Sequence, residues 1–89
     1  MQKADFKDRF YEAILTLKTK EECDKFFSDA CTPKEIETIA QRFVVAQLIN
    51  EKKVYSEIIE ETGASTATIS RVNRAINEGF HLAFERLKK

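Results

Sequence analysis

The chain has 89 residues, 43% of them hydrophobic, and its 15 acidic and 15 basic side chains cancel to a formal net charge of zero. Residues 1–89 suffice for one domain, and with only two Gly and one Pro we expect long helices and an all-α fold. No apolar run approaches the roughly 20 residues of a membrane span, and the charged start is no secretory signal, which predicts a cytoplasmic protein without a membrane partner.

The N-terminal third of the sequence predicts two amphipathic helices. The first runs from Asp5 to Thr19, where apolar residues recur at helical spacing. Thr19 is then an N-cap for a second helix that ends at about Ala30, because Glu22 stands in the capping-box position. The side chains that we expect to point inward are Phe6, Phe10, Ala13, Ile14 and Leu17 in the first helix, and Cys23, Phe26 and Phe27 in the second.

The strongest helix start follows at residue 32. Thr32 fits the N-cap, Pro33 fits the first helical position, and Glu35 completes a capping box, so we expect a helix to about Lys52. Its apolar residues are Ile36, Ile39, Ala40, Phe43, Val44, Val45, Ala46, Leu48 and Ile49. That arc is wider than one packing face requires, which predicts cover from a second subunit and hence a homodimer. The alternative is a central core helix within one chain.

The segment from Tyr55 to Ile76 has the pattern of a helix-turn-helix. A short helix is predicted from Tyr55 to Thr62, with Tyr55 and the adjacent isoleucines as its apolar side. Gly63 suits the left-handed conformation that ends many helices. Ser65 can cap the next helix by accepting a hydrogen bond from the amide of Thr68. The apolar anchors that we expect are Ile58 and Ile59 in the first helix, and Ala67, Ile69 or Val72, and Ile76 in the second.

The second helix of this pair leaves short polar groups and cations on its other faces: Thr66, Thr68, Ser70, Asn73 and Arg74. Such groups can approach base edges in the major groove, and Arg71 and Arg74 can reach phosphates or guanine. No acidic residue occurs from Thr62 through Asn77. The pattern therefore predicts DNA binding, although helix pairs with a Gly-containing turn also occur in proteins that never touch DNA.

The remaining residues predict a last helix and little material for catalysis. Glu78 to Leu87 forms an amphipathic helix that could pack on its own chain or across a dimer. Cys23 and Cys31, with His81 as the only histidine, fall short of the about four ligands of a zinc site. We expect buried or half-buried cysteines and a surface or interface histidine. With no phosphate loop and no nucleophile–base pair, the chain is predicted not to be an enzyme and to need no metal or cofactor.

Net neutrality is unusual for a nucleic-acid-binding protein, because a basic surface usually supplies the affinity for phosphate. The charges are nevertheless unevenly distributed along the chain. Acidic residues crowd the N-terminal half, whereas the late basic residues are Lys52, Lys53, Arg71, Arg74, Arg86, Lys88 and Lys89. A DNA-facing side can therefore be locally positive, and we expect modest non-specific affinity.

Several features of the sequence occur together in one known family. They are Thr32-Pro33-Lys34-Glu35, Arg42 in the long helix, Glu57-Ile58, and the run GASTATISR that begins at Gly63. On these features the chain resembles the tryptophan-repressor family, most closely its YerC/YecD-type members from Gram-positive bacteria. The resemblance covers about residues 32–76 with one gap, and the flanking helices fit in number and length.

The resemblance implies an intertwined all-α homodimer of about six helices that regulates transcription by binding palindromic double-stranded DNA. Two recognition helices would enter successive major grooves about one helical turn apart. The residues implied to face bases are Thr66, Ala67, Thr68 and Ser70, with Tyr55 and Ser56 near the backbone. Together with the residues chosen above, the predicted DNA-binding set is Tyr55, Ser56, Ser65, Thr66, Ala67, Thr68, Ser70, Arg71, Asn73 and Arg74. Ser56 and Ile59 replace basic residues of the repressor, so the operator should differ and phosphate anchoring should be lighter.

The resemblance also implies a ligand pocket, with departures. Arg42 and Arg71 match the two arginines that sandwich the indole in tryptophan-binding members, and Thr32 matches the mouth of the pocket. Val72 replaces a glycine and would intrude on a flat ring, whereas Ala75 replaces a serine and leaves an amine unpaired at a cost of about 1–3 kcal/mol. Tryptophan is therefore not the expected effector, and a different small ligand or none stays open. Alternatively, Arg42 and Arg71 pair with phosphate or with a partner's carboxylate.

Two functions compete on these observations. The first is sequence-specific DNA binding and transcription regulation. The second is a dimeric helical interaction module that has lost DNA reading, which the zero net charge and the missing basic residues favour.

Overall fold

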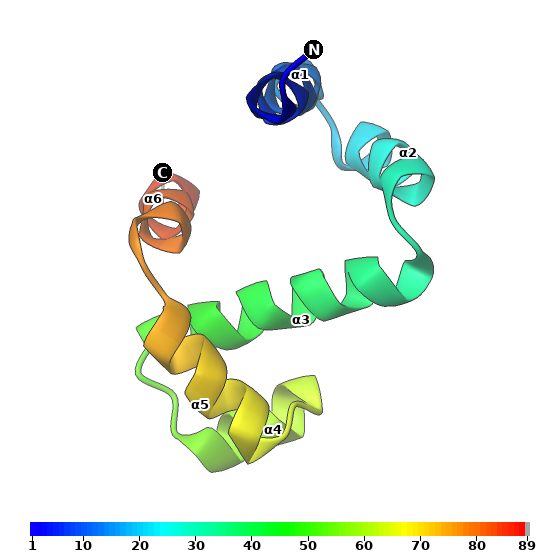
Figure 1. Cartoon of the computed structure of the whole chain (residues 1–89). Coiled ribbons are helices and arrows are strands. Elements are labelled where there is room, and N and C mark those ends of the chain that lie inside the picture. The colour runs from blue at the N-terminus through cyan, green and yellow to red at the C-terminus, as the bar shows by residue number, and fades with distance from the viewer. Residues whose placement is uncertain (89) are drawn as a thin grey trace. The chain divides into compact units, whose positions relative to one another are not determined.

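The computed structural model describes residues 1–88, which form six α-helices and no strand (Figure 1). The helices are α1 (Lys3–Ile14), α2 (Lys20–Ala30), α3 (Pro33–Asn50), α4 (Tyr55–Thr62), α5 (Thr66–Ala75) and α6 (Glu78–Leu87). This confirms the all-α prediction. The chain divides into an N-terminal unit, residues 1–36, and a C-terminal unit that begins at residue 37. Whether residues 1–89 behave as a single domain stays a prediction.

Helix α1 is shorter at its C-terminal end than the expected Asp5–Thr19, and that boundary was wrong. The amides of Thr16 and Leu17 donate to the carbonyls of Ala13 and Ile14, which lie only three residues earlier. The Thr16 hydroxyl also donates to the Ala13 carbonyl at 2.6 Å. These contacts tighten the last turn and use the carbonyl that a continuing helix would need, so Leu17 lies outside the helix.

The predicted caps of α2 and α3 are confirmed. The Thr19 hydroxyl accepts from the Glu22 amide at 3.1 Å, although the Glu22 carboxylate accepts from the Lys18 amide rather than closing a reciprocal box. At α3 the box is complete: Thr32 Oγ1 accepts from the Glu35 amide at 3.1 Å, and Glu35 Oε1 accepts from the Thr32 amide at 2.8 Å. Hydrogen bonding to the carboxylate, from the Thr32 backbone first and from the Thr32 side chain second, stabilises its charged form and lowers the pKa of Glu35.

The N-terminal unit contains no buried residue. Its apolar contacts are aromatic: the ring of Phe10 lies 5.6 Å from that of Phe26 and 6.4 Å from that of Phe27, centroid to centroid. The prediction that Cys23 points inward was wrong, because Cys23 is exposed and the two Phe side chains make the contacts with α1. Cys31 is half-buried, as expected.

The C-terminal unit has a buried core to which α3, α4, α5 and α6 all contribute. Its buried residues are Val45, Ala46, Ile58, Ala64, Ile69, Val72 and Phe84. Phe43 and Phe80 pack edge to face at a centroid distance of 5.3 Å on the rim of this core. His81 is exposed, with its ring 5.8 Å from that of Phe84, which agrees with a surface position.

Helix α3 ends at Asn50, two residues before the expected Lys52, because the chain turns there without a glycine. Lys52 has a φ of 67°, and its amide donates to the Ile49 carbonyl. The Lys53 amide donates to the Leu48 carbonyl, which completes a Schellman motif. No Gly or Pro marks this end in the sequence, so the apolar pattern predicted a helix that was two residues too long.

Within the C-terminal unit, the wide apolar arc of α3 is only partly covered. Val45 and Ala46 are fully buried, whereas Ile39 is 56% and Val44 is 41% exposed. The other helices of the C-terminal unit therefore do not cover this arc by themselves.

Candidate nucleic-acid interface

The predicted helix-turn-helix is present, with α4 and α5 packed against each other (Figure 1). Gly63 ends α4 in the left-handed conformation, with a φ of 72°, and its amide donates to the Ile59 carbonyl at 2.9 Å. A Cβ at this glycine would meet no atom within 4 Å. The backbone conformation, rather than lack of space, is therefore what requires glycine here.

Two polar side chains that the sequence interpretation missed hold this turn. The Thr62 hydroxyl donates to the Ile58 carbonyl at 2.7 Å and accepts from the Ala64 amide at 3.1 Å. Gln41 on α3 donates through Nε2 to the Thr62 carbonyl at 3.2 Å. A threonine before a helix-ending glycine is a weak local signal for such a role. Nothing in the sequence could point to Gln41, which lies 21 positions from its partner.

Burial within the pair corrects two predicted anchors. Ile58 and Ile69 are fully buried, but Ile59 is 40% exposed and Ala67 is exposed. Ala64 in the turn is buried instead. Ile59 lies about 100° around the helix from Ile58, so the two cannot share one narrow contact face. Ala67 similarly lies on the outer side of α5, which removes it from the core and keeps it in the candidate interface.

The N-terminal end of α5 presents small side chains outward. Ser65 is the N-cap, and its hydroxyl accepts from the Thr68 amide at 3.1 Å, as predicted. The same hydroxyl donates to Thr68 Oγ1, also at 3.1 Å. Thr66 and Ala67 are exposed, and Thr68 is half-exposed. This end of α5 can approach another molecule closely because no large side chain blocks it.

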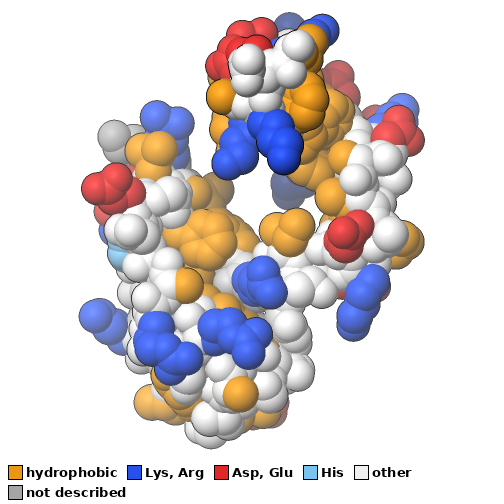
Figure 2. Space-filling model, viewed as in Figure 1, with side chains coloured by type: hydrophobic (Ala, Val, Ile, Leu, Met, Phe, Trp, Pro, Cys, Tyr) orange, Lys and Arg blue, Asp and Glu red, His pale blue; other side chains and the backbone are white. Residues whose placement is uncertain are grey.

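The polar residues farther along α5 are accessible as well. Arg71, Asn73 and Arg74 are exposed, and Ser70 is half-exposed. Neither arginine forms an ion pair within residues 1–88. Figure 2 shows basic side chains over the region of α5 on the visible face. Their charge is therefore available to an anionic partner.

Helix α4 differs in charge from α5. Tyr55 is 37% exposed and Ser56 is exposed, so both can reach a ligand beside the helix start. The exposed acids Glu57, Glu60 and Glu61 lie on the same helix. The net neutrality of the chain thus does not extend to α5, which carries two arginines and no acid.

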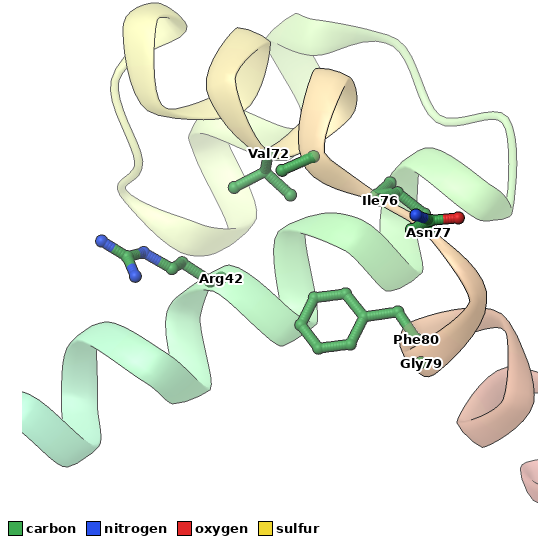
Figure 3. Close-up of a pocket in the computed structure, with 7 residues that line it drawn as sticks. Arg42, Val72, Ile76, Asn77, Gly79 and Phe80 are labelled. Atoms are coloured by element: carbon green, nitrogen blue, oxygen red, sulfur yellow. The ribbon is translucent and has the colours of Figure 1, made fainter.

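A cavity of about 320 Å³ lies beside α5 in the C-terminal unit. Its lining residues are Arg42, Val72, Ala75, Ile76, Asn77, Gly79 and Phe80. Figure 3 shows that Arg42 comes from α3 and that Val72 comes from the neighbouring α5. Arg71, the other arginine proposed for a ligand site, does not line this cavity. Thr32 belongs to the N-terminal unit, and its place relative to Arg42 stays a prediction.

Across residues 1–88, no three His, Cys, Asp or Glu side chains gather as a metal site would require. None of the described helices has the length and apolar character to cross a membrane.

Comparisons with known proteins identify relatives over most of the chain. The sequence model of the family described as Trp repressor protein matches residues 7–88. The uncharacterized protein YerC of Bacillus subtilis (strain 168) is 48% identical over 85 residues, which cover 92% of this chain and 82% of that protein.

Two crystal structures share both fold and sequence with the chain. A TrpR-like protein from Eubacterium eligens ATCC 27750 superposes with a TM-score of 0.86 at 49% identity, covering 91% of this chain and 87% of the other. A candidate Trp repressor from Staphylococcus aureus gives a TM-score of 0.87 at 42% identity, covering 98% and 89%.

Proposed function

This chain belongs to the Trp repressor family, and from that premise we propose that it is a sequence-specific DNA-binding regulator of transcription, acting as a homodimer on palindromic sites. Members of this family are DNA-binding regulators rather than enzymes. The proposal places the protein in the cytoplasm, where it has access to the chromosome.

The observation that carries the proposal is the outward N-terminal end of α5. Ser65 caps it, Thr66 and Ala67 stand clear of the core, and the half-exposed Thr68 follows. An α-helix fits the major groove of B-DNA, and short hydroxyl and methyl groups at its tip can reach base edges. Hidden or bulky side chains at these positions would have argued against such a role.

The proposed contacts divide into two kinds. Those that read bases come from the tip and outer side of α5, namely Ser65, Thr66, Ala67, Thr68 and Ser70. Those that position the protein on phosphates come from Tyr55, Ser56, Arg71, Asn73 and Arg74. Phosphate contacts supply affinity that is independent of sequence, whereas base contacts supply the discrimination.

The exposed apolar side chains support the homodimer. Leu15 on the N-terminal unit is 83% exposed, and Ile39 on α3 is 56% exposed. Phe6 and Tyr11 on α1 are exposed as well. Burying one such side chain contributes about 1.5–3 kcal/mol, so covering several of them in a second copy would stabilise an assembly strongly. A two-fold dimer would also present two copies of α5 to a palindrome.

A small effector other than tryptophan remains part of the proposal, with the cavity beside α5 as its site. Val72 and Ala75 both line that cavity. The valine side chain occupies space that a flat indole would need, and the alanine offers no hydrogen bond to an amine. Arg42 can supply a charge for an anionic group of a ligand. Its other role, and that of Arg71, would be pairing with DNA phosphate or with a partner's carboxylate.

Selection from a random duplex library at low salt tests the main proposal. An enriched palindrome is expected with the purified protein, and the absence of enrichment at every salt concentration would instead support a dimeric interaction module. Thr68→Ala should relax preference at one position of each half-site by about 1 kcal/mol. Arg74→Ala should weaken binding evenly across sequences and reduce the salt slope by about 1.

Repeating the selection with each amino acid added tests the effector. We expect tryptophan to leave the affinity unchanged. A tryptophan response would show that Val72 does not close the cavity to an indole ring.

A further inference from the structure

A second cavity, of about 240 Å³, lies where the end of α3 meets α5 and α6 in the C-terminal unit. Its polar lining side chains are exposed, and its two isoleucines are half-buried. The residues that line this Lys52 pocket are Ile49, Asn50, Lys52, Asn73, Ile76 and His81, so within residues 1–88 no acidic side chain borders it. A polar pocket with a cation and no acid attracts anions.

The backbone of Lys52 is an independent observation at the same place. Its φ is 67°, and Lys52 is the one non-glycine residue with a positive φ within residues 1–88. This conformation costs stability for a residue with a Cβ, and Gly would adopt it freely. Strain of this kind is found where a site has a function. Here the strained residue places a lysine at the pocket, and Lys52 makes no ion pair within the described residues.

The polar groups of the Lys52 pocket are all able to donate hydrogen bonds. The ammonium of Lys52 only donates, and the amide groups of Asn50 and Asn73 donate through nitrogen. The imidazole of His81 keeps at least one N–H whether it is neutral or charged. Phosphate oxygens accept hydrogen bonds and carry negative charge, so this set of donors suits a phosphate group.

The position of the pocket beside α5 indicates which phosphate it would meet. Neighbouring residues of an α-helix are about 100° apart around its axis, so Arg71 and Asn73 lie on nearly opposite flanks of α5. A helix in the major groove has a sugar-phosphate backbone on each side. Arg71 supplies a cation on one flank, whereas Asn73 is neutral. Lys52 and His81 stand beside Asn73 on the other flank.

We propose that the Lys52 pocket binds a phosphate of the DNA backbone on the flank of α5 opposite Arg71. Lys52 supplies the charge, and Asn73 and His81 supply further hydrogen bonds. The inference rests on the proposed DNA-binding function, and it extends the phosphate contacts beyond the helix-turn-helix to the end of α3 and to α6. A free phosphate ion offers the same chemistry as a backbone phosphate, and the experiment separates the two.

Lys52→Gly is the central variant, because strain and charge predict opposite results for it. Relief of the strain should raise the thermal unfolding midpoint. Loss of the cation should weaken binding to the selected duplex roughly fivefold and reduce the salt slope by about 1 for each half-site. Lys52→Asn, which also tolerates a positive φ and lacks the charge, should weaken DNA binding in the same way. A residue with a purely structural role would not weaken binding when its replacement stabilises the protein.

Two further variants are the controls. Lys52→Arg keeps the positive charge and should keep the salt slope. Lys53→Ala removes the adjacent exposed lysine, which does not line the pocket, and should change the salt slope less than Lys52→Gly does. Because a phosphate carries no base information, Lys52→Gly should weaken selected and unselected duplexes alike.

Duplexes in which one phosphate at a time is replaced by an uncharged methylphosphonate locate the contact. At one position in each half-site, the replacement should weaken the wild type roughly fivefold and leave Lys52→Gly unaffected, since that variant has already lost the interaction. An NMR titration of the DNA-free protein with inorganic phosphate tests the free ion. Saturation at micromolar phosphate, together with wild-type DNA binding by Lys52→Gly, would overturn the assignment to DNA.

The outcomes separate this inference from the proposed function. A wild type that selects no duplex overturns the function. A wild type that selects a site, with unchanged affinity and salt slope in Lys52→Gly and Lys52→Asn, leaves the function intact and overturns the phosphate pocket.

Discussion

The N-terminal unit and the C-terminal unit differ in how far they bury their apolar side chains. Both consist of amphipathic helices, and both place aromatic rings against one another. The C-terminal unit buries Ile58 and Ile69 completely and draws on four helices for its core. The N-terminal unit buries no residue fully and leaves Leu15 and Phe6 in contact with solvent.

The difference in burial suits the two units to different roles. A unit with its own core can hold the proposed recognition helix rigidly, as the proposed discrimination between bases would require. A unit of two helices without buried side chains cannot offset the entropy of ordering its chain, so it needs another surface. In the proposed dimer, that surface is the second copy of the protein.

The largest effect should come from the core of the C-terminal unit. Ile69→Ala removes a fully buried side chain and should destabilise the protein by about 2–5 kcal/mol in denaturant unfolding. Ile59→Ala in the adjoining helix is the matched control, with an expected cost below about 1 kcal/mol because Ile59 is exposed. Equal costs would remove the distinction between core and surface on which the comparison depends.

The next effect tests the dependence of the N-terminal unit on a partner. Phe10→Ala should weaken self-association by about 2 kcal/mol, or roughly thirtyfold in the dissociation constant, as measured by sedimentation. Val54→Ala, which trims an exposed residue outside that unit, should leave self-association unchanged. A wild type that stays monomeric at all concentrations would contradict our explanation of the uncovered surface.

A smaller effect concerns the start of α3. Thr32→Ala removes the hydroxyl that caps Glu35 and should cost about 0.5–2 kcal/mol. Because folding lowers the pKa of Glu35, its contribution to stability is present above the ordinary carboxyl pKa and is lost as the pH falls through the lowered value. In Thr32→Ala, an NMR titration should find the pKa of Glu35 closer to its ordinary value.

Thr19→Ala is the control for that measurement. It deletes the corresponding cap of α2 and should leave the titration of Glu35 unaltered, since Thr19 makes no contact with that carboxylate. A shift of equal size in both variants would mean that general loosening of the helices, rather than the capping box, changes the pKa.

The smallest effect lies at the end of α3. Lys52→Gly should stabilise the protein by about 0.5–1 kcal/mol, because a residue with a Cβ is strained at the φ of 67° found there. Gly63→Ala should destabilise the protein by about 1 kcal/mol, because it places a Cβ at a φ of 72°. Thermal unfolding of both variants checks the pair, and a destabilised Lys52→Gly would show that the lysine side chain contributes more than the strain costs.

Local chemistry made the helix starts predictable. Thr19, Thr32 and Ser65 each accept a backbone hydrogen bond within three residues, so the sequence pattern contains both partners. The turn at Gly63 was equally predictable, because the glycine itself is the sequence signal. Helix ends without a glycine were not predictable in this way, since α3 ends at Asn50 and the sequence predicted an end at about Lys52.

Some features of the candidate site were predictable from the sequence and others were not. The exposure of α5 and the cap at Ser65 follow from periodicity and capping, and the sequence indicated both. The Ser65–Thr68 hydroxyl contact and the Gln41–Thr62 bond depend on the placement of side chains, in the second case from another helix. Sequence spacing says nothing about such contacts.

By itself the sequence determined six helices, where most of them begin, the glycine turn and the family. These depend on interactions between residues a few positions apart. Only the tertiary structure decided that Ile58 and Ala64 enter the core while Ile59 and Ala67 face outward. The reason is that an apolar residue at the edge of a helix's apolar face is buried only if a neighbouring helix covers that edge. Sequence spacing does not show which edge the neighbouring helices cover.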